Sequence, residues 1–318
     1  MSKARELSQR AGVDGALSNR NKVINGSFLV WQRSESAYTN SGYASVDRFM
    51  ATRGRIRKPN TSGYTGEDNT GAVFDCLDGG VYSHFDYYIE DIGQKLHGKT
   101  MTLSFKMKSL TGSSESLYLD QTGTNAFDFG GSTTITVPTE WTTFTFTGTV
   151  VSTGYVGGVH LMRWYLNPTG SSAVSKRLQI DEVQFEEGDT ATPFEHRSYG
   201  QELALCQRYT TVFNDSVGIW GIGRWETSAV YVDCTLPVQL RTFPTVTMPS
   251  NNGVYAVDPT VAWYQVQNFV GISTNSVIKP SLSFNMGGAY AANKTYTTLG
   301  MYSNSGAGQL IFDAELYG

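Results

Sequence analysis

The feature that most constrains the fold of this chain is an alternation of apolar and polar residues with a period of two. Between residues 101 and 108, the odd-numbered positions are Met, Leu, Phe and Met, and the even-numbered positions are Thr, Ser, Lys and Lys. Successive side chains of a strand point to opposite faces of a sheet, so this pattern predicts a half-buried antiparallel strand. Phe144 and Phe146 alternate with threonines in the same way, and threonine is favoured on a pleated surface.

One predicted strand shows this alternation with a slip. Leu178 and Ile180 share one phase, whereas Val183 and Phe185 have the opposite phase. A shift of one residue turns the apolar side chains to the other face of the sheet. The sequence therefore predicts a β-bulge near Asp181–Glu182.

Farther along, the alternation recurs in residues 228–236, 281–286 and 310–316, and Gly, Asn and Ser clusters separate these runs. Helical spacing occurs only in residues 2–12 and 200–209. The second of these segments interrupts the strand pattern and follows Pro193, so we place a domain boundary near residue 198.

The chain has 318 residues, which is long enough for about two domains. We predict an all-β protein, in which an N-terminal arm precedes a jelly-roll β-sandwich and a second, smaller β-sandwich domain. The predicted ranges are 1–20, 21–198 and 199–318.

Charge, cysteine and hydropathy patterns exclude several function classes. The formal net charge is −4 without a long basic block, so nucleic acid is not an expected partner. The three cysteines have no CxxC spacing, which predicts buried free thiols rather than a zinc cluster or a disulfide framework. The first residues contain no apolar signal core and no run approaches the roughly 18 apolar residues of a membrane span. We expect a soluble protein without membrane insertion, folded in a reducing compartment.

Catalytic signatures are mostly missing from the sequence. It contains no GxSxG, HExxH or P-loop motif, and its four histidines are scattered. Glycoside hydrolysis requires only two carboxylates about 5 to 10 Å apart, so three sets of carboxylates keep a hydrolase open as an alternative. They are Glu186–Glu187, Glu226, and Asp120 with Asp128. We expect no enzymatic activity, because carboxylates at strand ends and in loops are ordinary solubilising residues.

Aromatic residues are the more informative feature, because Phe, Trp and Tyr make up 13% of the chain and many lie in polar stretches. A flat ring beside Asn, Gln or Asp suits a sugar, which offers a C–H face for stacking and hydroxyls for hydrogen bonds. Such rings also fill cores and interfaces, and for any single residue that interpretation is favoured. The candidate ligand-binding residues are Tyr82, Tyr87, Tyr88, Trp164, Tyr165, Trp220, Trp225, Trp263 and Tyr264.

Two long blocks of sequence resemble a known family. Residues 24–49 contain Asn25-Gly26, Trp31-Gln32-Arg33, Tyr43 and Asp47-Arg48-Phe49, and resemble the opening of the carbohydrate-binding-module-like domain of phage tail fibre proteins. Phe49 stands where Trp is commoner in that family. Residues 183–209, with "ATPFEHR" and "CQRY", resemble the block that closes this domain and opens the next. The start "MSKARELSQRAG" and "PVQLRTFPTVTM" are similar to the particle-attachment arm and to a strand of the C-terminal domain of such fibres.

The resemblance implies a virion protein, a homotrimer in most fibres, that is made in the host cytoplasm and displays β-sandwich domains to the host surface. Residues 1–20 would attach to a phage tail or capsid protein, residues 21–198 would face the host-surface polysaccharide, and residues 199–318 would form a trimerising domain. The chain lacks the long shaft and the large β-helix of other relatives. A structural capsid fibre, decoration or tail adaptor protein without specific receptor binding is the alternative.

The opening motif brackets a loop, and we predict that it builds this loop rather than binding a ligand. Asp47 would pair with Arg33 or Arg48, bidentate where geometry allows. Trp31, Arg33, Asp47 and Arg48 are therefore structural candidates, and we expect this rim to meet the block at residues 181–197.

Similar jelly rolls often hold a structural calcium ion between the first and last strands, and calcium requires hard oxygen ligands. Asn25 and Asp181 are candidates for such a site; the alternative is that Asp181 caps the bulge. No other cofactor is expected.

Overall fold

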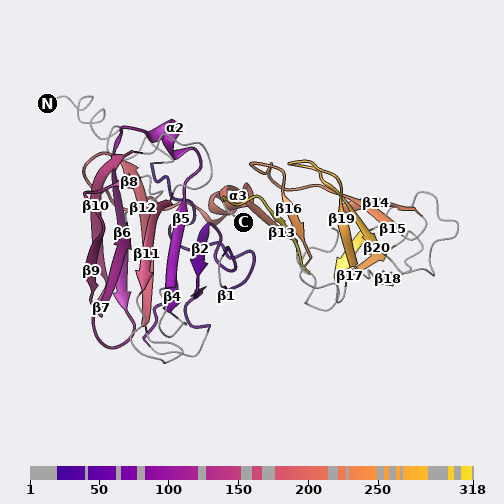
Figure 1. The fold of residues 1–318 in the computed structure, drawn as a ribbon. Helices are drawn as coiled ribbons and strands as arrows, with labels where there is room; N and C mark the ends of the chain where they lie inside the picture. Colours follow the sequence, from indigo (N-terminus) through magenta and orange to yellow (C-terminus); the bar gives the residue numbers. More distant parts are fainter. Residues whose placement is uncertain are drawn as a thin grey trace, which may run out of the picture. The chain divides into compact units, whose positions relative to one another are not determined.

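The computed structural model describes most of the chain. The described residues are 20–39, 42–61, 66–76, 83–120, 127–151, 160–166, 176–213, 221–226, 229–248, 254–257, 263–265, 268–285, 300–303 and 309–316. The chain divides into two compact units, Met1–Ser198 and Tyr199–Leu316. Each is built almost entirely from antiparallel strands, so the protein is all-β (Figure 1).

The first unit contains a seven-stranded sheet and a five-stranded sheet. In spatial order, the larger sheet consists of β1 (Ser36–Thr39), β3 (Gly54–Arg57), β4 (Ala72–Cys76), β12 (Lys176–Glu187), β6 (Thr100–Ser109), β10 (Thr142–Val150) and β8 (Phe127–Asp128). The smaller sheet consists of β2 (Phe49–Thr52), β5 (Ser83–Tyr88), β11 (His160–Leu166), β7 (Glu115–Asp120) and β9 (Thr133–Val137). The short helix α2 (Ile92–Leu96) connects β5 to β6.

The core of this unit lies between the two sheets. Phe74 of the larger sheet stacks on Phe85 of the smaller one, with ring centroids 4.1 Å apart. Trp164 meets Phe105 edge to face at 5.7 Å. These contacts identify a β-sandwich, because apolar side chains from the inner faces of two sheets interdigitate there.

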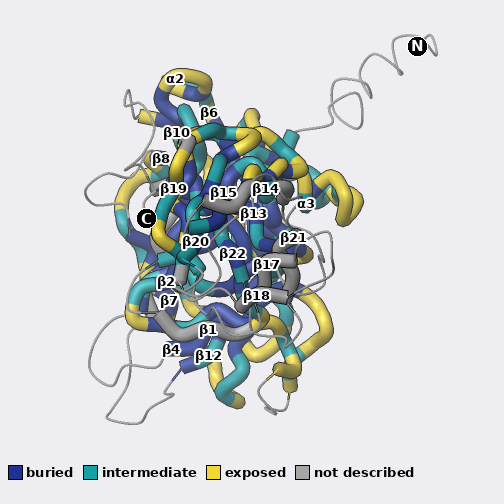
Figure 2. Tube along the Cα trace, turned by 90° about the vertical axis from the view of Figure 1, so that its right-hand side faces the viewer, coloured by how far each residue is buried: buried dark blue, intermediate teal, exposed yellow. Residues whose placement is uncertain are grey.

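The predicted alternation is confirmed in β10 and only partly confirmed in β6. In β10 the outward-facing threonines are exposed and the phenylalanines pack on the core. In β6 the inward side chains are buried as predicted, but Thr102 and Lys108 on the other face are buried too. Thr102 donates to the Gly188 carbonyl at 2.9 Å and Lys108 donates to the Gly66 carbonyl at 2.9 Å. The strand is thus not half-exposed, because connecting segments cover its outer face. Figure 2 shows buried residues along strands and exposed residues in connections such as the one around α2.

The predicted bulge is confirmed in β12. The register of β12 against β6 shifts between Asp181 and Gln184, and Glu182 adopts a φ of 52°. The Asp181 carboxylate accepts a hydrogen bond from the Glu182 amide at 2.8 Å. Burial raises the pKa of Asp181 above its ordinary value. Asp181 therefore caps the bulge.

The second unit begins with α3 (Tyr199–Gln207), which overlaps the segment 200–209 where helical spacing was observed. One sheet consists of β13 (Thr210–Phe213), β22 (Leu310–Asp313) and β16 (Thr245–Thr247); a second consists of β14 (Gly221–Glu226), β15 (Ala229–Cys234), β20 (Ser281–Asn285) and β19 (Asn268–Thr274). A third consists of β18 (Trp263–Gln265), β17 (Val254–Val257) and β21 (Gly300–Ser303). Inward residues of the first two sheets share one core, which includes Val230, Val232, Phe284, Leu310 and Phe312. The alternation predicted these buried positions.

All three cysteines are buried free thiols, as predicted. Among them, Cys234 has a pKa that burial raises to about 12. In the part of the chain that the structure describes, no helix is long and apolar enough to cross a membrane.

Candidate ligand-binding face

The opening motif is organised around the buried carboxylate of Asp47. Arg33 Nη1 lies 3.4 Å from Asp47 Oδ1, so the predicted ion pair forms with Arg33. The backbone amide and the side-chain amide of Gln32 donate to Asp47 Oδ2 at 3.3 and 3.1 Å. Arg48 donates to the carbonyl of Tyr88 at 2.8 Å, and the Trp31 indole donates to the carbonyl of Phe28 at 2.6 Å. These bonds hold the loop and the start of β2 together.

Asn25 completes this loop. Its Oδ1 accepts from the Val30 amide at 3.0 Å, and its Nδ2 donates to the carbonyls of Val30 and Asp47 at 2.9 and 3.1 Å. The carboxamide is therefore engaged with the backbone, and Asp181 caps the bulge. These two residues do not fit a shared calcium site. Among the described residues, no group of three or more His, Cys, Asp and Glu side chains is arranged to hold a metal ion.

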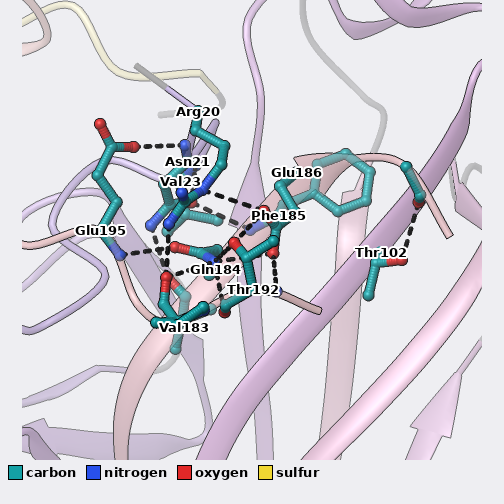
Figure 3. A network of polar contacts seen from close by, with 12 residues as sticks. Arg20, Asn21, Val23, Thr102, Val183, Gln184, Phe185, Glu186, Thr192 and Glu195 are labelled. Atoms are coloured by element: carbon teal, nitrogen blue, oxygen red, sulfur yellow. Dashed lines mark hydrogen bonds and ion pairs between the residues drawn. The ribbon is translucent and has the colours of Figure 1, made fainter. Parts of the chain in front are cut away.

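Residues 20–23, which directly precede the opening block, meet the closing block in a polar seam (Figure 3). The opening block itself contacts it where the Val183 amide donates to the Gly26 carbonyl at 2.9 Å. The expected contact of Trp31–Arg33 and Asp47–Arg48 with residues 181–197 stays a prediction. The Asn21 amide donates to Glu195 Oε2 at 2.6 Å, and Asn21 Nδ2 donates to the Val183 carbonyl at 3.0 Å. Arg20 Nε lies 3.1 Å from Glu186 Oε2. Arg197 donates to the carbonyls of Asn21 and of Val23. This seam joins residues 20–23 to the closing block, so Val183, Glu186, Glu195 and Arg197 have structural contacts there.

The seam also accounts for one of the carboxylate sets that left a hydrolase open. Glu186 is 1% exposed, and it accepts hydrogen bonds from the amide and the hydroxyl of Thr192 in addition to the Arg20 contact. Asp128 accepts from the Gly130 amide at 2.9 Å and so supports a turn. Both carboxylates have local structural partners.

Several of the candidate aromatic residues lie in the core or close to it. Trp164 is 0% exposed and Tyr87 is 1% exposed, and their rings pack on Phe105 and Phe49 respectively. Tyr88 is 4% exposed. These three rings cannot stack on a ligand in this structure, because protein atoms cover them.

The other six candidates are less fully described. Tyr165 lies in β11, Trp225 in β14, and Trp263 and Tyr264 in β18; the structure describes the backbone at these positions. Tyr82 and Trp220 lie outside the described residues.

The outer face of the five-stranded sheet brings chemistry-bearing residues together, and we call it the polar face. Its strand register defines two rows of residues across the sheet. The first row is Met50, Asp86, Arg163 and Asp120. The second row is Thr52, His84, Tyr165, Tyr118 and Thr134. Neighbouring strands are about 4.8 Å apart, so five strands span roughly 19 Å.

The residues of the polar face differ in solvent exposure. Tyr118 is 37% exposed, and Ser116, Thr134 and Thr136 on neighbouring positions are also exposed. Asp86 and Asp120 are buried, and Asp120 Oδ1 accepts a hydrogen bond from Ser132 Oγ at 3.3 Å. The face therefore presents an aromatic residue and hydroxyls to solvent beside a row that contains two buried carboxylates.

Sequence reasoning did not select Tyr118 as a ligand-binding candidate. The signal was present, because in Glu115–Asp120 the residues Leu117 and Leu119 point into the core and Tyr118 lies between them. The alternation predicts an outward tyrosine there. Which side chains lie beside it depends on the cross-strand register, which the sequence does not show.

Comparison with known proteins gives similarity at the level of structure. No protein-family model matches the sequence, and no curated protein matches it. A family 4 carbohydrate-binding module has a TM-score of 0.33 and 19% identity, over 52% of this chain and 98% of that one. The enzymatically active domain of bacteriophage CBA120 tailspike protein 4 has a TM-score of 0.32 and 18% identity, over 53% of this chain and 22% of that one. A carbohydrate-binding module, TmCBM61 in complex with β-1,4-galactotriose, has a TM-score of 0.31 and 16% identity, over 54% of this chain and 100% of that one.

Proposed function

We propose that this protein binds carbohydrate through the polar face of its first unit. The observation that carries the proposal is the partly exposed Tyr118, which lies beside exposed hydroxyl side chains on a sheet that packs against the core. A sugar ring can stack its C–H face on an aromatic ring while its hydroxyls exchange hydrogen bonds with neighbouring side chains. A span of roughly 19 Å accommodates several sugar units of one chain.

Within this class, the protein acts as a phage fibre adhesin that binds host-surface glycans during adsorption. The sequence blocks at residues 24–49 and 183–209 support this, since they resemble the corresponding blocks of phage tail fibre proteins. On this proposal the protein is a homotrimer in the virion, residues 1–20 attach it to the tail or capsid, and residues 199–318 trimerise. Several weak sites per trimer give useful avidity.

The protein binds without catalysis on this proposal. Glu186 and Asp128 have structural partners, and Asp120 accepts a hydrogen bond from Ser132. The polar face holds Asp86 and Asp120 in one row, separated by the strand that carries Arg163. Asp86 and Asp120 are therefore two strand spacings, or about 10 Å, apart, which is the upper end of the separation of two glycosidase carboxylates. Release of reducing sugars from bound polysaccharide is the direct assay for hydrolysis.

The test is binding of the labelled protein to an array of bacterial O-antigen and capsular polysaccharides, followed by binding to cells that display the polysaccharides recognised. The comparison that decides the site is Tyr118→Ala against Tyr199→Ala. Tyr199 is a matched control, because it is an exposed tyrosine, at 57%, in the second unit. We expect the first variant to lose binding and the second to retain it. Failure of the wild-type protein to bind any polysaccharide would move the function to a structural fibre, decoration or adaptor role.

A further inference from the structure

We infer that Tyr43 forms a second aromatic wall at the edge of the polar face, and that the buried pair Arg33–Asp47 positions it there. This inference rests on the proposed function, because it concerns the same carbohydrate site. It assigns to the opening motif a purpose beyond closing its own loop.

The segment that contains Tyr43 lies beside the edge strand β2. Gly42 and Ala51 form an antiparallel bridge, in which the Gly42 amide donates to the Ala51 carbonyl at 3.0 Å and the Ala51 amide donates to the Gly42 carbonyl at 3.1 Å. Ala51 belongs to β2, which is an edge strand of the five-stranded sheet. The bridge therefore extends this sheet by one short backbone segment.

Tyr43 lies on the same side of the five-stranded sheet as the polar face. The bridge is the single pair Gly42 and Ala51; we extend its antiparallel register by one residue, which sets Tyr43 opposite Met50. Ala51 points into the core, so Met50 and its neighbour across the bridge lie on the polar face. Met50 is only 8% exposed, which means that adjacent atoms cover it. Tyr43 thus extends the row that contains Met50, Asp86 and Asp120.

The ring of Tyr43 contacts Arg33. The guanidinium carbon of Arg33 lies 5.7 Å from the centroid of the Tyr43 ring, which is the geometry of a cation–π contact. Arg33 is itself held by Asp47 at 3.4 Å, and the two side chains are 5% and 1% exposed. Because the Arg33 guanidinium is buried and paired with Asp47, its position is fixed. The ring is therefore held against a fixed partner, while Tyr43 as a residue stays partly exposed.

These steps give the site two aromatic residues with different supports. Tyr118 lies on the regular strand β7, and Tyr43 lies on a segment that Arg33 and Asp47 fasten to β2. Aromatic contacts held in place in advance favour binding, since less side-chain freedom is lost when the ligand arrives. Arg33 and Asp47 act as positioning residues and Tyr43 as the contact residue.

The test uses the array polysaccharide that the wild-type protein binds most tightly, with affinity measured by calorimetry on the full chain. We expect Tyr43→Ala to weaken binding roughly five- to tenfold and Tyr43→Phe, which keeps the ring, to stay within about twofold of wild type. Arg33→Met should weaken binding to a similar extent. The double variant that combines Arg33→Met with Tyr43→Ala should bind the polysaccharide no more weakly than Tyr43→Ala alone, because both changes remove the same contact.

Three outcomes are distinguishable, with thermal unfolding of every variant as the check on folding. If Tyr118→Ala abolishes binding and Tyr43→Ala leaves it unchanged, this inference is overturned and the proposed function stands. If neither variant changes the affinity of a binding wild-type protein, the site lies elsewhere and both fail. If Arg33→Met does not fold, the pair Tyr43→Ala and Tyr43→Phe still decides whether the ring contributes.

Discussion

Arg33 and Asp47 form an ion pair at 3.4 Å inside the first unit, and neither side chain has more than 5% of its surface exposed. The residues are fourteen positions apart in the sequence, and the loop between them includes Tyr43. The same carboxylate accepts two hydrogen bonds from Gln32. The pair therefore fixes both ends of the segment from residue 33 to residue 47, in which Gly42 bridges to Ala51 on the edge strand β2.

Removing one partner of this pair should destabilise the first unit strongly. Asp47→Ala leaves the Arg33 guanidinium buried without its carboxylate, and breaking a buried pair costs about 3 to 5 kcal/mol. We expect the free energy of unfolding measured in urea to fall by that amount. Lys58→Ala is the control, since its pair with Glu35 is half-exposed and such pairs contribute roughly 0 to 1 kcal/mol. If Asp47→Ala folded with wild-type stability and lost host binding, the structural role would be wrong.

Two glycines allow the effect of close packing to be separated from that of backbone conformation. Gly71 has a φ of +70°, and a Cβ there would lie 2.0 Å from the Ile180 carbonyl oxygen of β12. Gly112 has a φ of +79° with open space around it. We expect Gly112→Ala to cost about 1 to 2 kcal/mol through backbone strain alone. Gly71→Ala should cost clearly more, because the backbone of β12 must also shift. Equal losses in thermal unfolding would contradict this assignment.

Glu67 should make stability depend on pH in the acidic range. Burial, the largest single influence, tends to raise its pKa. The hydrogen bonds from Arg57 and from the Asn60 amide, together with the positive charges of Arg57 and Arg177, outweigh this and hold the pKa below its ordinary value of 4.5. The side chains of Glu67 and Arg57 are fully buried, with Oε1 and Nη2 at 2.5 Å. For a carboxyl group with a lowered pKa in the folded state, the stabilisation is complete above the unfolded-state pKa. It is lost as the pH falls through the folded-state pKa.

Glu67→Gln should therefore be less stable than wild type near pH 7, and the difference should shrink below pH 4.5. Urea unfolding at a series of pH values measures this difference. Glu35→Gln is the matched control, because Glu35 is 57% exposed in its pair with Lys58. A difference between Glu67→Gln and wild type that stayed constant from pH 7 to pH 3 would show that the charge of Glu67 is not what stabilises the fold.

The three thiols should be unreactive in the folded protein. All three cysteines are buried, and the pKa of Cys234, about 12, leaves almost no thiolate at neutral pH. Thiolate is the nucleophilic form of cysteine. A disulfide reagent such as 5,5′-dithiobis(2-nitrobenzoic acid) should label no thiol in buffer and all three in denaturant. Rapid labelling of the native protein would show that a core opens on the time scale of the assay.

The sequence by itself determined the elements that depend on local chemistry. Period-two alternation identified β6, β10, β15, β20 and β22, because a strand places successive side chains on opposite faces. The phase slip between Ile180 and Val183 located the bulge for the same reason. An ion pair of Asp47 with Arg33 or Arg48 was expected from the opening motif, and the structure shows the pair with Arg33.

Only the tertiary structure decided which polar residues are covered and which aromatic residues meet. Lys108 belongs to the polar phase of β6 but is buried, because the distant segment around Gly66 lies over it. Tyr118 is 37% exposed, but the residues opposite it, Tyr165 on β11 and Thr134 on β9, follow only from the strand register. The polar face likewise assembles residues from β2, β5, β7, β9 and β11. Its composition depends on strand order and register, which are set by contacts between segments far apart in the chain and leave no local periodic signal.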